Sequence, residues 1–182
     1  MRQKTILVTG GARSGKSKFA QKLASGLGEP VLFVATAEAL DEEMRERIEE
    51  HRKSRPATWE TLEVRRHVGT KILERAFKIR TVLIDCIALL VNNILFDCSK
   101  DEELDPARAE KEVRDEMEEL ISCMRQLAAN FIIVTNEVGL GIVPGERVSR
   151  LYRDLLGKAN QMLAECAGEV YLLISGIPLK IK

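Results

Sequence analysis

Histidine and aromatic residues are scarce in this sequence, and neither sign of charge dominates it. Of 182 residues, 2 are histidine and 4% are aromatic. So few histidines exclude zinc sites built at the usual cysteine and histidine spacings. Lys+Arg and Asp+Glu both number 28, so the formal net charge is zero. The balance excludes strong overall attraction to nucleic acid or to an anionic membrane, and any anion site must therefore be built locally.

Long apolar segments are also missing. The longest apolar stretch, residues 82–96, is interrupted by an aspartate and two asparagines, so we expect no membrane insertion. The apolar run near the N-terminus is too short for a signal peptide. A cytoplasmic protein with one domain, residues 1–182, is therefore expected. The cysteines form no C-x-x-C pair and are predicted to be free, buried or half-buried thiols: Cys86, Cys98, Cys123 and Cys166.

Short β-branched runs alternate with longer helical patterns along the chain. This alternation predicts an α/β fold with a mainly parallel sheet flanked by helices. The residues 97–119 are rich in acids and are interpreted as a loop and a solvated helix. The strands are predicted at 5–9, 31–35, 81–85, 131–135 and 169–175, with a short C-terminal edge hairpin at 178–182. The helices are predicted at 15–26, 40–54, 86–96, 105–129 and 146–167.

The most specific motif is G-G-A-R-S-G-K-S, residues 10–17, which matches the phosphate-binding P-loop pattern G-x-x-x-x-G-K-[ST]. It follows a predicted strand and begins a predicted helix, so backbone N–H groups and the helix N-terminus can converge on an anion. Lys16 is expected to reach the β- and γ-phosphates, and Ser17 to offer its hydroxyl to Mg²⁺. The motif therefore predicts a P-loop domain of the RecA-like type that binds ATP or GTP.

Two further strand ends carry polar side chains. The run T-V-L-I-D ends in Asp85, which resembles a Walker B carboxylate at the carboxyl edge of a neighbouring strand. An aspartate that merely begins a turn would give the same pattern. Asn136 and Glu137 follow the strand 131–135 and lead into a glycine-containing loop. They are either ligand-binding residues at the sheet crevice or residues chosen for loop geometry alone.

The stretch R-I-E-E-H-R-K-S-R-P places His51 among cations near the end of a predicted helix. Leu40, Met44 and Ile48 recur at four-residue steps, and His51 extends this apolar stripe toward the core. Nearby cations disfavour the imidazolium, which would leave a ring nitrogen free to attack phosphorus. A packed or capping histidine on a charged helix end fits the same pattern, and both interpretations stay open at this point. His67 lacks such a setting and is expected at the surface.

Nearly the whole chain resembles one known family. The resemblance rests on I-L-V-T-G-G-A-R-S-G-K-S, V-A-T-A-E-A-L-D-E-E-M, R-I-E-E-H-R-K-S-R-P-A-T-W, L-I-D-C-I-A-L-L-V-N-N, V-T-N-E-V-G-L-G-I-V-P and S-G-I-P-L-K-I-K. On these blocks the chain is similar to bifunctional adenosylcobinamide kinases / adenosylcobinamide-phosphate guanylyltransferases of cobalamin biosynthesis.

The resemblance implies two reactions and a site. The first transfers the γ-phosphoryl group of ATP or GTP to adenosylcobinamide. The second transfers GMP from GTP to adenosylcobinamide phosphate through a guanylyl-histidine, which the motif match places at His51. It also implies a homotrimer with nucleotide sites near subunit boundaries. The implied nucleotide contacts are Gly10, Gly11, Ala12, Arg13, Ser14, Gly15, Lys16, Ser17, Ala35, Thr36, Ala37, Arg52, Lys53, Ser54, Arg55, Glu63 and Asp85, with Ser17 and Asp85 at the metal.

Two positions depart from the family pattern. Glu50 stands where some members have a second histidine beside His51, and Asp85 stands where some carry a glutamate. Two alternative functions remain for comparison. One is a plain P-loop small-molecule kinase in which His51 is structural. The other is a non-catalytic GTP-binding switch, although the chain has no N-K-x-D motif of the kind that G proteins use to recognise guanine.

Overall fold

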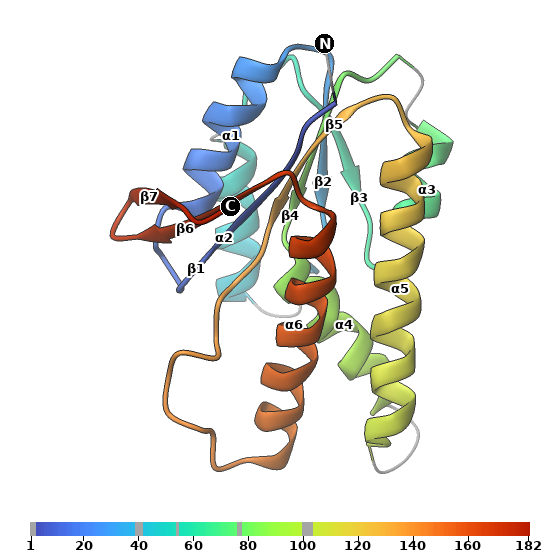
Figure 1. Ribbon diagram of the computed structural model, residues 1–182, viewed down its shortest axis with the longest axis vertical. Helices are drawn as coiled ribbons and strands as arrows, with labels where there is room; N and C mark the ends of the chain where they lie inside the picture. Colours follow the sequence, from blue (N-terminus) through green and yellow to red (C-terminus); the bar gives the residue numbers. More distant parts are fainter. Residues whose placement is uncertain (1–2, 39–41, 54, 76–77, 100–103) are drawn as a thin grey trace.

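The structure is a computed structural model that describes residues 3–38, 42–53, 55–75, 78–99 and 104–182. Strands and helices alternate along the chain, as the sequence predicts (Figure 1). The strands are β1 (Thr5–Gly10), β2 (Val31–Ala35), β3 (Glu60–Glu63), β4 (Thr81–Asp85), β5 (Asn130–Val134), β6 (Glu169–Ile174) and β7 (Ile177–Lys180). The helices are α1 (Lys16–Leu27), α2 (Glu42–Lys53), α3 (Val68–Arg75), α4 (Ile87–Cys98), α5 (Pro106–Gln126) and α6 (Arg147–Cys166).

The strands form one sheet in the order β3-β2-β4-β5-β1-β6-β7. All neighbours are parallel except β6 and β7, which pair antiparallel as a C-terminal hairpin. The four central strands β2, β4, β5 and β1 are almost entirely buried, because helices cover both faces of a parallel sheet. The predicted fold class, a mainly parallel α/β sheet with a C-terminal edge hairpin, is confirmed.

The helices form two layers. In Figure 1, α1 and α2 lie on one side of the sheet, and α3 to α6 lie on the other. This division follows from right-handed crossovers, since the chain moves toward β3 through α1 and α2 and back through the later helices. In α1, Ala20 and Ala24 are buried, and Phe19 and Leu23 pack against the core beside them. The P-loop helix thus buries the apolar face that its sequence predicts.

Two elements escaped the sequence analysis. The edge strand β3 has only Leu62 buried, so it lacks the apolar run of a central strand. The short helix α3 buries Val68, Gly69 and Ile72 against the rest of the molecule. Strand order also corrects one expectation. The strand that ends in Asp85 does not neighbour the P-loop strand β1, because β5 lies between β4 and β1. Order along the chain does not specify order in a sheet.

The cysteines lie where the composition predicted. Cys86, Cys98 and Cys123 are buried, Cys166 is half-buried, and all four are free thiols. None of the helices in the described ranges is both long and apolar enough to cross a membrane.

Candidate active site

The P-loop connects the end of β1 with the start of α1. Gly15 has φ +91°, a value that side chains with a Cβ rarely adopt, and it immediately precedes the first helical residue. Lys16 is buried, and its Nζ donates to the carbonyl oxygen of Gly11 at 2.6 Å. The buried hydroxyl of Ser14 has no hydrogen-bond partner among the described residues. A phosphate oxygen fits such a cradle of backbone N–H groups, hydroxyl and ammonium.

Two distant segments hold this loop in place. The amide of Gly176, in the turn of the C-terminal hairpin, donates to the Ser14 carbonyl at 3.0 Å. A Cβ on Gly15 would lie 3.2 Å from the Gly176 Cα, so the two backbones pack directly. The amide of Glu137 donates to the Gly10 carbonyl at 3.0 Å. Both segments support the loop from outside its own sequence.

Parallel register brings three predicted site residues to one edge of the sheet. Ala35, at the end of β2, lies opposite Glu63 of β3 on one side and opposite Asp85 of β4 on the other. Beyond Ala35, the hydroxyl of Thr36 donates to the Cys86 carbonyl at 2.7 Å and accepts from the Cys86 amide at 2.9 Å. The ends of β2 and β4 are therefore tied together where they lead into the site.

Charged side chains of the P-loop and of the segment after α2 converge on Asp85. Burial lowers the pKa of Lys16, while Cys86 and Asp85 act in the opposite direction. Burial also lowers the pKa of Arg55, Asp85 and Glu63 oppose that shift, and Arg52 adds to it. Charged side chains shift one another's pKa in this way only when they lie close together. The structure thus gathers three cations and two carboxylates, an arrangement that suits a polyphosphate with its metal.

The thiol beside Asp85 is not available as a nucleophile. Burial raises the pKa of Cys86 to about 12, and the Asp85 carboxylate adds to the shift. The thiol therefore stays protonated at neutral pH, and a protonated thiol is a poor nucleophile.

His51 lies in the last turn of α2, as its sequence position predicts. Its side chain, like those of Met44 and Ile48, lies outside the described residues, as do Leu40 and Ser54 entirely, so the inward orientation stays a prediction. Arg52 forms an ion pair with Glu63, and Lys53 is exposed.

The remaining predicted residues line the edge of this region with fewer contacts. Gly11, Ala12 and Arg13 are exposed in the loop, and Ser17 and Ala37 are half-buried. Asn136 accepts a hydrogen bond on its backbone carbonyl from the side-chain amide of Asn160 at 3.0 Å, and Glu137 turns its carboxylate to the Gly139 amide. Within the part of the chain that the structure describes, no three acidic, histidine or cysteine side chains gather closely enough to hold a metal ion by themselves.

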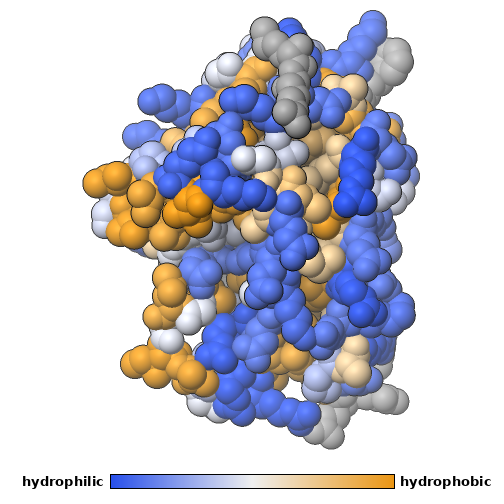
Figure 2. Space-filling view, viewed as in Figure 1, coloured by the Kyte–Doolittle hydropathy of each residue, from blue (hydrophilic) through white to orange (hydrophobic). Residues whose placement is uncertain are grey.

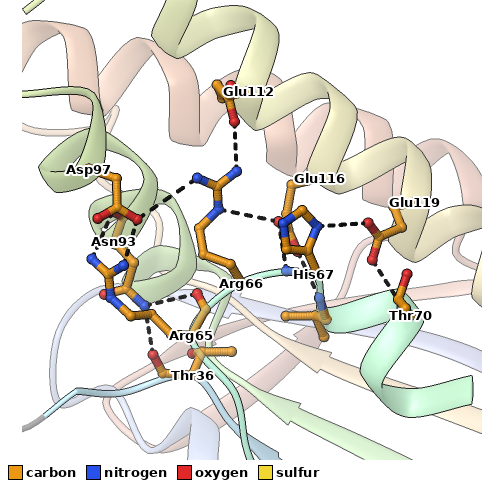
Figure 3. A network of polar contacts seen from close by, with 11 residues as sticks. Thr36, Arg65, Arg66, His67, Thr70, Asn93, Asp97, Glu112, Glu116 and Glu119 are labelled. Carbon is orange, nitrogen blue, oxygen red and sulfur yellow. Dashed lines mark hydrogen bonds and ion pairs between the residues drawn. The ribbon is translucent and has the colours of Figure 1, made fainter. Parts of the chain in front are cut away.

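The sequence analysis missed a network of ion pairs beside this edge (Figure 3). Arg65 bridges Glu38 at 2.6 Å and Asp97 at 2.5 Å. Arg66 pairs with Glu112 at 2.7 Å, and a fourth carboxylate, that of Glu116, accepts hydrogen bonds from the amides of His67 and Val68 at 3.0 and 2.8 Å. The interpretation of residues 97–119 as solvated was therefore wrong for the face of α5 toward α3, where Glu116 is buried. His67 itself is exposed, as expected, and contacts Glu119.

The fold and the loop together define a P-loop nucleotide-binding protein. A solved ATPase domain superposes with a TM-score of 0.55 at 13% identity, covering 94% of this chain and 69% of that one. An ATPase from the type III secretion system of pathogenic bacteria gives 0.54 at 10% identity, and this chain covers 51% of it. At such low identity these similarities concern the fold alone.

Sequence similarity is more specific. The family model of the cobinamide kinase / cobinamide phosphate guanyltransferase family matches residues 6–181, and this chain belongs to that family. The bifunctional adenosylcobalamin biosynthesis protein CobU of Salmonella typhimurium is 45% identical over 97% of this chain and 99% of its own length. The bifunctional adenosylcobalamin biosynthesis protein CobP of Pseudomonas aeruginosa is 40% identical over 97% of this chain and 96% of its own. The family predicted from the motifs is confirmed.

Proposed function

We propose that this chain phosphorylates adenosylcobinamide with ATP or GTP and then transfers GMP from GTP to adenosylcobinamide phosphate. One observation carries the proposal: the strand ends with Ala35, Glu63 and Asp85 share one edge, where Asp85 influences the pKa of both Lys16 and Arg55. The family and the names of its relatives support the choice of substrates.

The kinase step uses the P-loop. The aminopropanol hydroxyl oxygen of adenosylcobinamide attacks the γ-phosphorus, the bond to the β–γ bridging oxygen breaks, ADP or GDP leaves, and the hydroxyl proton passes to solvent. The Lys16 ammonium and the backbone N–H groups of the loop stabilise charge on the transferring phosphoryl group. The supporting feature is the buried ammonium beside Gly11.

The guanylyl step uses His51. A neutral ring nitrogen attacks the α-phosphorus of GTP, and the bond to pyrophosphate breaks, which leaves a guanylyl-histidine. A phosphate oxygen of adenosylcobinamide phosphate then attacks the same phosphorus and releases the histidine, giving adenosylcobinamide-GDP. Arg52 to Arg55 and Glu63 form the surrounding nucleotide contacts in this proposal. The supporting features are the Arg52–Glu63 ion pair and the position of His51 in the last turn of α2.

Mg²⁺ completes the proposed site. The Ser17 hydroxyl and the Asp85 carboxylate are oxygen ligands of the kind that Mg²⁺ prefers, and nucleotide phosphates supply further oxygens. When bound, the metal neutralises charge on the phosphates. Lys16 and Arg55 lie near Asp85, so the same site offers cations for the phosphates and a carboxylate for the metal.

We also propose one nucleotide-binding domain, a homotrimer and a cytoplasmic location. The C-terminal hairpin exposes Ile174, Ile177, Leu179 and Ile181, and Figure 2 shows apolar surface gathered over this hairpin. Such a patch on an edge strand suits contact with another subunit. Free thiols suit a reducing compartment.

Labelling with GTP tests the covalent step, and the chain offers a matched control because it has 2 histidines. The protein is incubated with Mg²⁺ and GTP radiolabelled at the α-phosphate, then denatured. We expect an acid-labile, alkali-stable label, as a phosphoramidate gives, in the wild type and in His67→Ala but not in His51→Ala. GTP labelled at the γ-phosphate should leave no label.

Three results would contradict the proposal. Label that persists in His51→Ala would exclude His51 as the guanylyl carrier. An unlabelled wild type that still phosphorylates adenosylcobinamide would favour a plain kinase with a structural histidine. An unlabelled wild type that binds GTP without either reaction would favour a switch.

A further inference from the structure

The connection between β2 and α2 is anchored at two points before the helix begins. Thr36 is fully buried and bonds to Cys86, as described above. Two residues later, the carboxylate of Glu38 accepts a hydrogen bond from Nε of Arg65 at 2.6 Å. The Glu38 side chain is half exposed. Among the described contacts, this ion pair holds it to the rest of the molecule.

Arg65 fixes that connection against α4. Its guanidinium also reaches the Asp97 carboxylate at 2.5 Å. Its backbone carbonyl accepts a hydrogen bond from the side-chain amide of Asn93 at 3.3 Å, and the same amide donates to the Thr36 carbonyl at 2.9 Å. Figure 3 shows how Thr36, Asn93 and Arg65 meet at this point. Residues of α4 therefore hold both the backbone before α2 and the guanidinium that binds Glu38.

The other end of α2 is held by the same short segment. Glu63, at the end of β3 and two residues before Arg65, pairs with Arg52 in the last turn of α2. The described side chains of α2 itself are all exposed, from Glu42 to Lys53. These exposed side chains give the helix little orientation, so among the described contacts those at its two ends set its position.

From this geometry we infer that Arg65 is a positioning residue for guanylyl transfer, which acts through Glu38 on the helix that carries His51. The inference rests on the proposed function, in which His51 attacks the α-phosphorus. Nucleophilic attack requires close alignment of the reacting atoms, and a displacement of about 1 Å can cost up to about a hundredfold in rate. The P-loop lies outside this anchor, so the kinase step depends on it far less.

Single-turnover kinetics separate the two reactions. For Arg65→Gln we expect the rate of guanylyl-enzyme formation from GTP to fall about tenfold, with the concentration of GTP at half-maximal rate changed by less than about twofold. Phosphorylation of adenosylcobinamide by ATP should change by less than about twofold. Arg65→Lys, which keeps one ion pair, should recover part of the lost rate.

Arg66→Gln is the matched control. Arg66 is the adjacent arginine in the same network, but its partners Glu112, Glu116 and Asp97 lie on α4 and α5. The variant loses comparable ion pairs without touching the connection before α2, so guanylyl-enzyme formation should stay within about twofold of the wild type.

Glu38→Gln tests the same contact from the half-exposed side, where a substitution is tolerated more readily. It should reproduce most of the loss seen in Arg65→Gln, and the double variant should be no slower than Arg65→Gln alone, because both substitutions remove the same Arg65–Glu38 ion pair. Wild-type guanylylation in Arg65→Gln and Glu38→Gln would overturn the inference, as would equal losses in both reactions or an equal loss in Arg66→Gln. A wild type that forms no guanylyl-enzyme would instead overturn the proposed function.

Discussion

The guanidinium carbon of Arg55 lies 3.7 Å from the centre of the Phe33 ring. Phe33 is buried in β2, so the ring offers a fixed apolar surface beneath a half-buried cation. The buried Nε of Arg55 has no hydrogen-bond partner among the described residues. The arrangement presents a planar donor group at the same edge as Asp85, where we propose that the nucleotide phosphates bind.

Replacement of Arg55 by lysine keeps the charge but loses both the planar donor group and its stacking on Phe33. We expect Arg55→Lys to weaken GTP binding about tenfold, measured by calorimetry. Arg45→Lys is the control, since Arg45 is exposed on α2 and contacts Glu42 on its own helix. Wild-type affinity in Arg55→Lys would show that this guanidinium has no role in binding.

Lys16 is expected to dominate phosphoryl transfer. Its ammonium is buried and held by the Gly11 carbonyl, so the protein needs little rearrangement to stabilise the charge that develops on the phosphate. Lys16→Met should lower phosphorylation of adenosylcobinamide at least about a hundredfold. Lys18→Met, at an exposed position of the same helix, should match the wild type. Undiminished activity in Lys16→Met would contradict the P-loop assignment.

Close packing of α3 on α5 depends on a glycine. A Cβ on Gly69 would lie 2.6 Å from the carbonyl oxygen of Glu119, and backbone cannot yield as a flexible side chain can. Gly69→Ala should therefore lower the free energy of unfolding by about 1–3 kcal/mol, measured by urea titration. A Cβ on Gly157 in α6 would meet no atom within 4 Å, so Gly157→Ala should raise it by about 0.5–1 kcal/mol. Equal effects at both positions would contradict this packing.

The hairpin strands are joined to the N-terminal strand by Glu169. Hydrogen bonds from Tyr171, Lys180 and Lys4 lower the pKa of Glu169 to about 2. Since the folded-state pKa lies below the ordinary value of 4.5, this stabilisation is present above pH 4.5 and is lost as the pH falls toward 2.

Glu169→Gln should therefore lower the free energy of unfolding by about 1 kcal/mol at neutral pH, a modest value because the lysine partners are exposed to solvent. The difference from the wild type should be constant above pH 4.5 and shrink below it, followed by thermal unfolding across a pH series. Glu118→Gln, at an exposed position of α5, should leave the unfolding free energy unchanged. A difference that grows in acid would contradict this assignment.

Local patterns predicted the central strands and the P-loop because each carries its own signal. Strands covered on both faces must be continuously apolar, and an anion-binding loop needs glycines before a helix. The edge strand β3 has no such run, since hydrogen bonds from β2 hold a segment with one buried side chain. The start of helix α3 carries no capping signal in the local sequence, because the carboxylates of Glu116 and Glu119 on α5 accept the hydrogen bonds of its first N–H groups.

The sequence by itself determined the family, the P-loop and the position of His51 along the chain, because these depend on residue order and spacing. Only the tertiary structure placed β5 between the P-loop strand and Asp85, and only it brought Arg65 to Glu38 and Asp97. Strand order and long-range ion pairs arise when segments distant in sequence pack together, and no local pattern encodes which of many charged residues will meet.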